Sequence, residues 1–95
     1  MSFANKSTQD VFDGVASKHA RMFPAALHGV AIRKLDMIDA AHDLNDLRVP
    51  PGNRLESLRG DLAGYHSIRV NDQYRIVFRW MSGGAHDVEI IDYHR

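Results

Sequence analysis

Three neighbouring side chains near the end of the sequence could do chemistry together. Asp92, Tyr93 and His94 supply a carboxyl, a phenol and an imidazole. The imidazole titrates nearest to neutrality, so His94 is suited to act as a general acid or a general base. Asp92 can orient the imidazole or tune its charge, and Tyr93 can stack on a planar group or hydrogen-bond a phosphate. Terminal residues usually fray, and a lone histidine near a C-terminus is most often exposed and inert, so these residues alone leave both a reactive site and a polar tail open.

Arginine is the second residue type that could do chemistry. The planar guanidinium fork suits phosphate, which it can bind through two parallel hydrogen bonds. The formal net charge of zero argues against a strongly basic nucleic-acid-binding surface. Surface salt bridging remains the alternative for any single arginine. Every cationic residue after position 47 is an arginine: Arg48, Arg54, Arg59, Arg69, Arg75, Arg79 and Arg95.

Length and composition limit the classes of protein to consider. The chain has 95 residues, which predicts one domain, 1–95, with a single modest core. Cysteine is absent, which excludes disulfides and a thiolate nucleophile. No two of its histidines stand four residues apart, so we expect no metal site and no cofactor. No apolar stretch approaches the roughly 20 residues of a membrane span, so we expect a cytoplasmic protein without membrane contact.

The first half of the sequence predicts two helices that must carry the core. Ser7 can cap a helix from Thr8 to about His19, although Gly14 weakens it. A second helix is predicted from Pro24 to near Leu47. Its apolar stripe recurs at spacings of 4, 4 and 3 and is expected to form core: Leu27, Ala31, Leu35 and Ile38.

The second half changes to the alternation of β-strands. Residues 66–70 and 74–80 predict a hairpin around Asn71-Asp72-Gln73, and residues 87–93 predict a third strand. Two helices followed by an antiparallel meander indicate an α+β fold. We expect the two N-terminal helices to pack on one face of a small twisted antiparallel sheet.

The expected register places cations and the phenol on one sheet face. Keeping apolar residues opposite each other puts Arg69 opposite Arg75 on the face away from the core. A loop over 82–86 then pairs Phe78 with Ile90, Arg79 with Glu89 and Arg75 with Tyr93. Arg79 is thereby neutralised, whereas Arg69 and Arg75 lack an acidic partner. Because like charges destabilise directly opposed positions, these two arginines are the better candidates for binding an anion.

These features together resemble a known family. They comprise Arg59-Gly60-Asp61, the strand Ser-Ile-Arg-Val, the strand Tyr-Arg-Ile-Val-Phe-Arg-Trp and the terminal Asp92-Tyr93-His94. The sequence resembles HigB-type toxins of the RelE/ParE superfamily, the plasmid maintenance system killer proteins. The resemblance covers nearly the whole chain and is most specific in the second half.

The resemblance implies a function and partners. It implies a ribosome-dependent endoribonuclease that cuts messenger RNA and needs no cofactor. It also implies a HigA-like helix-turn-helix antitoxin that silences the toxin, with the ribosome and messenger RNA as the other partners. The implied fold is RelE-like and microbial-ribonuclease-like, which agrees with the order of predicted elements.

The resemblance also implies residue roles. The family's terminal Asp-Tyr-His falls on Asp92, Tyr93 and His94, and its strand arginine falls on Arg75. Glu56 stands where some members carry a catalytic histidine, and a glutamate can serve as a general base. Our hypothesis is Glu56 as base and His94 as acid, with the reverse assignment open. The predicted phosphate-binding residues are Arg54, Arg59 and Arg69.

Two other functions remain open at this point. The ParE side of the superfamily suggests a non-nuclease toxin that acts by binding a protein target, although the Asp92-Tyr93-His94 terminus argues against it. Alternatively, Glu56 is the first sign of a decayed catalytic set, and the chain is only an antitoxin-binding module.

Overall fold

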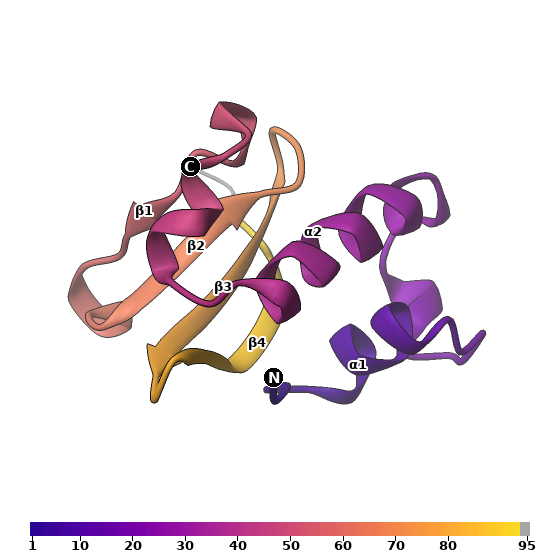
Figure 1. The fold of residues 1–95 in the computed structure, drawn as a ribbon. Helices are drawn as coiled ribbons and strands as arrows, with labels where there is room; N and C mark the ends of the chain where they lie inside the picture. The colour runs from indigo at the N-terminus through magenta and orange to yellow at the C-terminus, as the bar shows by residue number, and fades with distance from the viewer. Residues whose placement is uncertain (94–95) are drawn as a thin grey trace.

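The computed structural model describes residues 1–93, in which a helical half packs on an antiparallel sheet (Figure 1). The four strands are antiparallel and lie in the order β1-β2-β3-β4. This architecture confirms the predicted fold class. The helices and strands are α1 (Lys6–Asp13), α2 (His28–Ala40), β1 (Glu56–Ser57), β2 (Tyr65–Arg69), β3 (Tyr74–Met81) and β4 (Gly84–Asp92).

Helix α1 begins earlier than predicted, at Lys6 instead of Thr8, and ends earlier, at Asp13 instead of His19. Asn5 is its N-cap, because the Asn5 side-chain oxygen accepts a hydrogen bond from the Thr8 amide at 2.9 Å. Gly14 ends the helix in the left-handed conformation at φ 69°. The prediction of a helix from Thr8 to His19 was therefore wrong in both its cap and its length.

Helix α2 is likewise shorter than the predicted span from Pro24 to Leu47. A separate 3-10 turn, Ala25–Leu27, precedes it, and another, Leu44–Arg48, follows it. The second turn is stabilised by a capping box between Asp43 and Asp46. Short polar side chains that hydrogen-bond to nearby backbone groups compete with helix continuation. This explains why the helix ends at Ala40 although apolar residues continue to Leu47.

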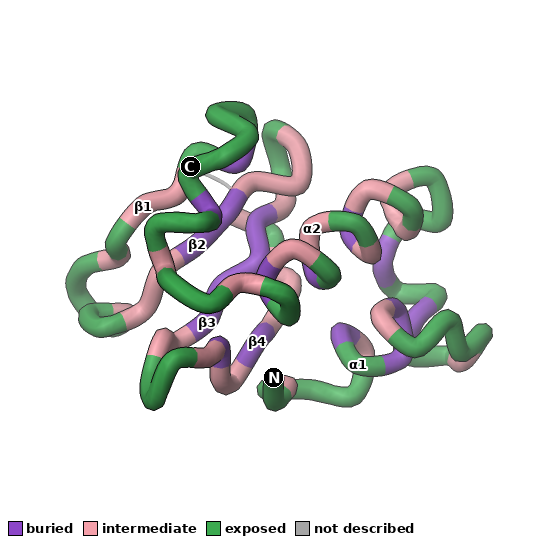
Figure 2. The backbone as a smooth tube through the Cα atoms, viewed as in Figure 1, coloured by how far each residue is buried: buried purple, intermediate pink, exposed green. Residues whose placement is uncertain are grey.

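The main core lies between α2 and the sheet (Figure 2). Leu35 and Ile38 of α2 are buried against Ile68, Ile76 and Phe78. The predicted core stripe of the second helix is thereby confirmed for its central residues. Since side chains alternate along a strand, the neighbours of these sheet residues point to the opposite face, away from α2.

The predicted register of the first hairpin is confirmed. Arg69 lies directly opposite Arg75, and Ile68 lies opposite Ile76. The side-chain oxygen of Asn71 accepts hydrogen bonds from the amides of Gln73 and Tyr74 at 2.9 and 2.7 Å, which closes the loop. Two arginines therefore do share one side of the sheet.

The second hairpin turn is tighter than predicted. Strand β4 begins at Gly84, so the expected loop over 82–86 does not form. Ser82 and Gly83 both have positive φ, 53° and 73°. Two-residue turns of this kind match the twist of paired strands. Serine is an unusual residue for such a position, so the sequence indicated a loop here but not that it is only two residues long.

The tight turn and a β-bulge beyond it together move the β3–β4 register by two residues. Ile90 lies opposite Ile76 instead of Phe78, and a register irregularity between Val77 and Arg79 marks a bulge, at which Asp87 has φ 53°. A shift of two residues preserves the side-chain faces, whereas a shift of one would exchange them. The predicted partners were wrong, but the predicted faces were right.

Strand β1 was not predicted. It is only the pair Glu56–Ser57, and Glu56 lies opposite Ser67 of β2. This short pairing adds the segment before it to the edge of the sheet.

No helix within residues 1–93 is long and apolar enough to cross a membrane.

Candidate functional site

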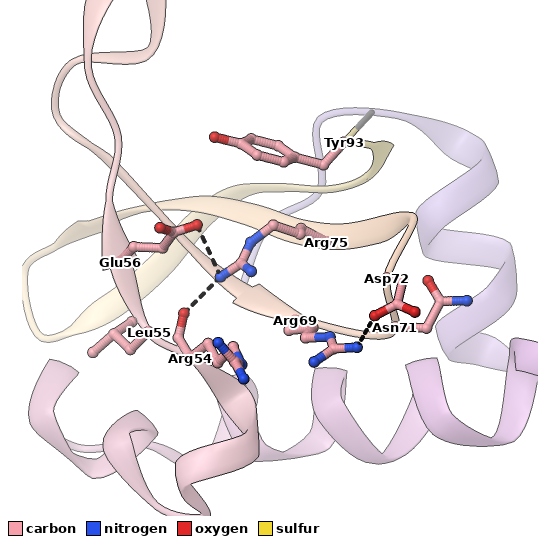
Figure 3. Close-up of a pocket in the computed structure, with 8 residues that line it drawn as sticks. All are labelled: Arg54, Leu55, Glu56, Arg69, Asn71, Asp72, Arg75 and Tyr93. Atoms are coloured by element: carbon pink, nitrogen blue, oxygen red, sulfur yellow. Dashed lines mark hydrogen bonds and ion pairs between the residues drawn. The ribbon is translucent and has the colours of Figure 1, made fainter. Parts of the chain in front are cut away.

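An open cleft of about 610 Å³ lies beside the side chains of Arg69 and Arg75 (Figure 3). The loop before β1, β1 itself, the β2–β3 hairpin and the residue after β4 all contribute to it. Four of the predicted site residues are brought together with Tyr93. The lining residues are Arg54, Leu55, Glu56, Arg69, Asn71, Asp72, Arg75 and Tyr93.

Arg75 lies at the base of the cleft, and its side chain is only 10% exposed. Its Nε donates a hydrogen bond to Ser67 Oγ at 2.7 Å, and its Nη2 donates to the Arg54 carbonyl at 2.6 Å. Glu56 Oε1 lies 3.4 Å from the same Nη2. A guanidinium held through two different nitrogens is fixed in both position and tilt, because the group is planar and rigid.

Glu56 reaches the cleft because β1 pairs with β2. Its carboxylate is 38% exposed, so it faces both Arg75 and solvent. A carboxylate so placed can accept a proton from a substrate bound in the cleft. The structure thus brings together the predicted base and the predicted strand arginine.

Arg54 adopts a left-handed backbone conformation, with φ 47° and ψ 55°. This conformation costs a side-chain-bearing residue on the order of 1 kcal/mol, and it directs the Arg54 carbonyl toward Arg75 (Figure 3). The turn is anchored beneath by fully buried Asn53, whose Nδ2 donates to the Leu47 carbonyl at 3.1 Å.

Lys34 of α2 holds this turn from the other side. Its Nζ donates to the Asn53 side-chain oxygen at 2.5 Å. Burial lowers the pKa of Lys34, and the nearby Arg33 charge lowers it further. The anchor ties the loop that carries Arg54 and Glu56 to the helical half.

The prediction that Arg69 and Arg75 lack acidic partners was wrong. Asp72 forms an ion pair with Arg69, and Glu56 forms one with Arg75. The first partner comes from the hairpin loop and the second from the unpredicted β1, so a register built on β2, β3 and β4 missed both. Each acid reduces the repulsion between the opposed arginines.

Arg79 also has a different partner from the one expected. Its Nε lies 3.0 Å from Asp87 Oδ2, and Glu89 lies opposite Val77. The bulge at Asp87 brings this carboxylate to Arg79. The interpretation of Arg79 as a structural arginine paired with an acid is confirmed, but the acid was wrong.

Tyr93 lies on the arginine face, as predicted. The Arg75 Cζ is 5.8 Å from the centre of the Tyr93 ring, within range of a cation–π contact. The Tyr93 amide donates to the Gln73 carbonyl at 2.7 Å. Tyr93 is thus diagonal to Arg75 rather than directly opposite it, which is the result of the two-residue shift. His94 lies outside the described residues.

Two predicted site residues lie outside the cleft lining. Asp92 is exposed, and its carboxylate accepts a hydrogen bond from Gln73 Nε2 at 3.0 Å. Alternation directs Asp92 and Tyr93 to opposite faces. Arg59 is exposed and directly precedes the 3-10 turn Gly60–Leu62 in the β1–β2 connection. Neither residue contributes to the lining.

Ser67 and Asp72 are partners of the site arginines that the sequence interpretation missed. The signal for Ser67 was present, since pairing Arg69 with Arg75 makes Ser67 a diagonal neighbour of Arg75 on the same face. Asp72 was assigned only to a loop. Among residues 1–93, no three or more histidine, aspartate and glutamate side chains are grouped so that they could hold a metal ion.

The architecture is the RelE-like α+β fold. A chain of the YoeB–YefM complex from Staphylococcus aureus matches it with a TM-score of 0.63 and 18% identity, covering 100% of this chain and 97% of that one. At this identity the similarity establishes the fold alone.

Sequence comparison identifies the family. The model of the HigB-like toxin family, described as RelE-like toxin of type II toxin-antitoxin system HigB, matches residues 1–94. Toxin HigB-1 of Vibrio cholerae is 42% identical over 85 residues, which are 90% of this chain and 87% of that protein. Endoribonuclease HigB of Proteus vulgaris is 36% identical over 61 residues, 64% of this chain and 65% of that protein. The chain therefore belongs to the HigB-like family of type II toxins, which implies a protein antitoxin as its partner.

Proposed function

We propose that this toxin is an endoribonuclease that cuts messenger RNA on the ribosome without a metal ion and so inhibits translation. The relative from Proteus vulgaris is named as an endoribonuclease. The observation that carries the proposal is the arrangement of Arg75, Glu56 and Tyr93. A nearly buried cation lies 3.4 Å from a half-exposed carboxylate and 5.8 Å from an aromatic ring in one open cleft.

These groups suit the cleavage of RNA at a phosphate. The reaction needs a base for the 2′-hydroxyl, an acid for the departing 5′-oxygen and cations for the charge that builds on the phosphate oxygens. Glu56 takes the proton of the 2′-hydroxyl, and Arg75 stabilises the phosphate charge. Tyr93 stacks on a base, as aromatic residues do in RNA recognition.

The remaining predicted residues have supporting roles in this proposal. His94 protonates the 5′-oxygen. Asp92 fixes the end of β4 through its hydrogen bond from Gln73 at 3.0 Å, and thereby positions Tyr93. Arg54 and Arg69 bind phosphates at the cleft, and Arg59, which lies outside it, binds a phosphate further along the RNA.

Mapping messenger-RNA ends in a purified translation system tests this function directly. Wild-type toxin should produce new ends within translated codons when ribosomes are present and none on the same RNA without ribosomes. Arg75→Ala should produce none. Arg79→Ala is the matched control, because Arg79 lies on the same strand but pairs with Asp87 outside the cleft, and it should cut normally.

Other outcomes would identify a different function. Growth arrest without RNA cuts would contradict the proposal and favour a non-nuclease toxin of the ParE kind. Good folding without any growth arrest would instead favour a decayed antitoxin-binding module.

We further propose that the antitoxin is a HigA-like helix-turn-helix protein and that the toxin acts in the cytoplasm, where ribosomes translate. Co-expression with the protein encoded beside the toxin gene should restore growth and yield a stable complex. A neighbouring gene product without a helix-turn-helix that nevertheless silences the toxin would contradict the first part.

A further inference from the structure

One buried polar side chain beneath the cleft has no part in the core. Ser67, near the middle of β2, is 0% exposed. Burying a hydroxyl is unfavourable unless it forms a hydrogen bond. The partner of Ser67 Oγ is Arg75 Nε at 2.7 Å, and the Ser67 carbonyl lies 3.4 Å from Arg75 Nη2. This serine therefore contacts the guanidinium through both its side chain and its backbone.

The sheet register places Ser67 between two groups of the cleft. On one side it lies opposite Glu56 of β1, and on the other side it lies opposite Val77 of β3. Val77 and Arg75 are two residues apart on the same face, so Ser67 is the diagonal neighbour of Arg75. The Ser67 hydroxyl thus contacts Nε of the guanidinium, whereas the Glu56 carboxylate lies beside Nη2.

Ser67 and Glu56 act on the guanidinium in different ways. Glu56 is an anion, so its contact neutralises part of the positive charge that a phosphate would meet. Ser67 is neutral, and its hydroxyl fixes Nε without reducing the charge. Together with the Arg54 carbonyl, which accepts from Nη2 at 2.6 Å, it holds the plane of the guanidinium at two points.

We propose that Ser67 is a positioning residue that aims the Arg75 guanidinium at the phosphate before RNA enters the cleft. The proposal rests on the proposed function, because it assumes that Arg75 contacts the reacting phosphate. Groups that stabilise a transition state are most effective when they are already oriented at the moment of reaction. Loss of the hydroxyl therefore affects the chemical step more than the binding of RNA.

Ser67→Ala tests this assignment, because it removes one oxygen and leaves the strand and its packing in place. Under single-turnover conditions on the ribosome, the cleavage rate should fall about 10- to 100-fold with an unchanged half-saturating toxin concentration, as expected for a lost hydrogen bond to a charged group. Ser67→Thr, which retains a hydroxyl, should recover most of the rate. A rise in the half-saturating concentration at an unchanged rate would overturn the proposal.

A double-variant measurement separates positioning from general loss of structure. Lysine carries a methylene group where arginine carries Nε–H, so Arg75→Lys already lacks the donor that Ser67 Oγ accepts from. Adding Ser67→Ala to Arg75→Lys should then cause less than a twofold further loss of rate. If the two losses instead multiply in full, Ser67 acts independently of Arg75 and the proposal is wrong.

Hydrogen exchange of the Arg75 Nε–H group tests the Ser67 contact without any measurement of RNA cleavage. The Arg75 Nε–H signal can be observed by nitrogen-15 NMR in the intact toxin and assigned by its loss in Arg75→Lys. Its exchange with water should be slow in the wild type and at least tenfold faster in Ser67→Ala. Equal exchange rates in the two proteins would refute the Ser67 contact even if the toxin cuts RNA, and an inactive wild type with the expected exchange difference would refute only the function.

Discussion

Arg75 and Arg69 face each other across β2 and β3, but they have contrasting surroundings. The Arg75 side chain is 10% exposed and is held by Ser67, the Arg54 carbonyl and Glu56. The Arg69 side chain is 31% exposed, and its ion pair is with Asp72, whose side chain is 98% exposed. One cation is built into the sheet, and the other is held at its surface.

The difference indicates a division of labour within one cleft. A charge that is nearly buried must be compensated by partners held in fixed positions. An exposed ion pair contributes only about 0–1 kcal/mol, so an incoming phosphate can replace Asp72 easily. Arg75 therefore suits the stabilisation of a transition state, and Arg69 suits adjustable binding of the RNA backbone.

Arg75→Lys should have the largest effect. Lysine keeps the positive charge but loses the planar group that reaches Ser67 and the Arg54 carbonyl together. We expect the single-turnover cleavage rate to fall by roughly 10²–10³-fold, comparable to the loss of one transition-state donor. Arg69→Lys is the matched control and should lose less than tenfold, mostly in binding. Equal losses in the two variants would remove the contrast.

Glu56→Gln should have the next largest effect. The amide keeps the shape of the side chain but removes its basicity, so the cleavage rate should fall by about 10²-fold, and the rate should no longer rise with pH on the acidic side. If Glu56 only neutralises Arg75, the substitution would instead tighten RNA binding and leave the rate unchanged. The pH profile of single-turnover cleavage distinguishes these two roles.

The sequence was sufficient to predict the side of the sheet on which each of these groups lies. Alternation fixed the faces of Arg69, Arg75 and Tyr93, and a face survives a register shift of two residues. The pairing of β3 with β4 was not predictable in the same way, because it depends on a two-residue turn at Ser82 and a bulge at Asp87. Both need positive φ at residues that rarely adopt it.

The partners of the arginines were harder to predict than the arginines themselves. Glu56 was identified as a possible base, but its approach to Arg75 depends on β1, a strand of two residues that carries no periodic signal. Asp72 is three residues from Arg69 in a loop, and loops have no period from which a contact can be inferred. Ser67 was accessible to prediction, because the confirmed register of the first hairpin already made it a neighbour of Arg75.

Asp72→Asn should have a small effect in the opposite direction. The substitution releases Arg69 from its exposed ion pair and makes the cleft more positive by one charge. We expect RNA to bind a few-fold more tightly, with an unchanged cleavage rate and a change in the free energy of unfolding within about 0.5 kcal/mol. Affinity should be measured at two salt concentrations, since the gain should shrink as salt rises. No gain in an Arg69→Ala background would confirm that the effect acts through Arg69.

Asp10 should affect folding but not cleavage, and it extends the contrast between fixed and exposed charges to the helical half. This carboxylate is 2% exposed, accepts a hydrogen bond from Ser17 Oγ at 2.6 Å and lies 2.9 Å from Lys6 Nζ. The Ser17 hydrogen bond, followed by Lys6, holds the pKa of Asp10 below its usual value of 3.8.

Because the pKa of Asp10 is lowered on folding, its charged form stabilises the folded protein above pH 3.8, and this stabilisation is lost as the pH falls through the lowered value. Asp10→Asn should therefore unfold at lower urea concentration than the wild type at neutral pH and lose less stability on acidification. Asp13→Asn, which changes an exposed carboxylate on the same helix, is the matched control. Its urea midpoint should change with pH in the same way as that of the wild type. If the urea midpoint of Asp10→Asn also follows that of the wild type at every pH, burial among fixed partners does not distinguish Asp10 from an exposed charge. The same reasoning would then fail for Arg75.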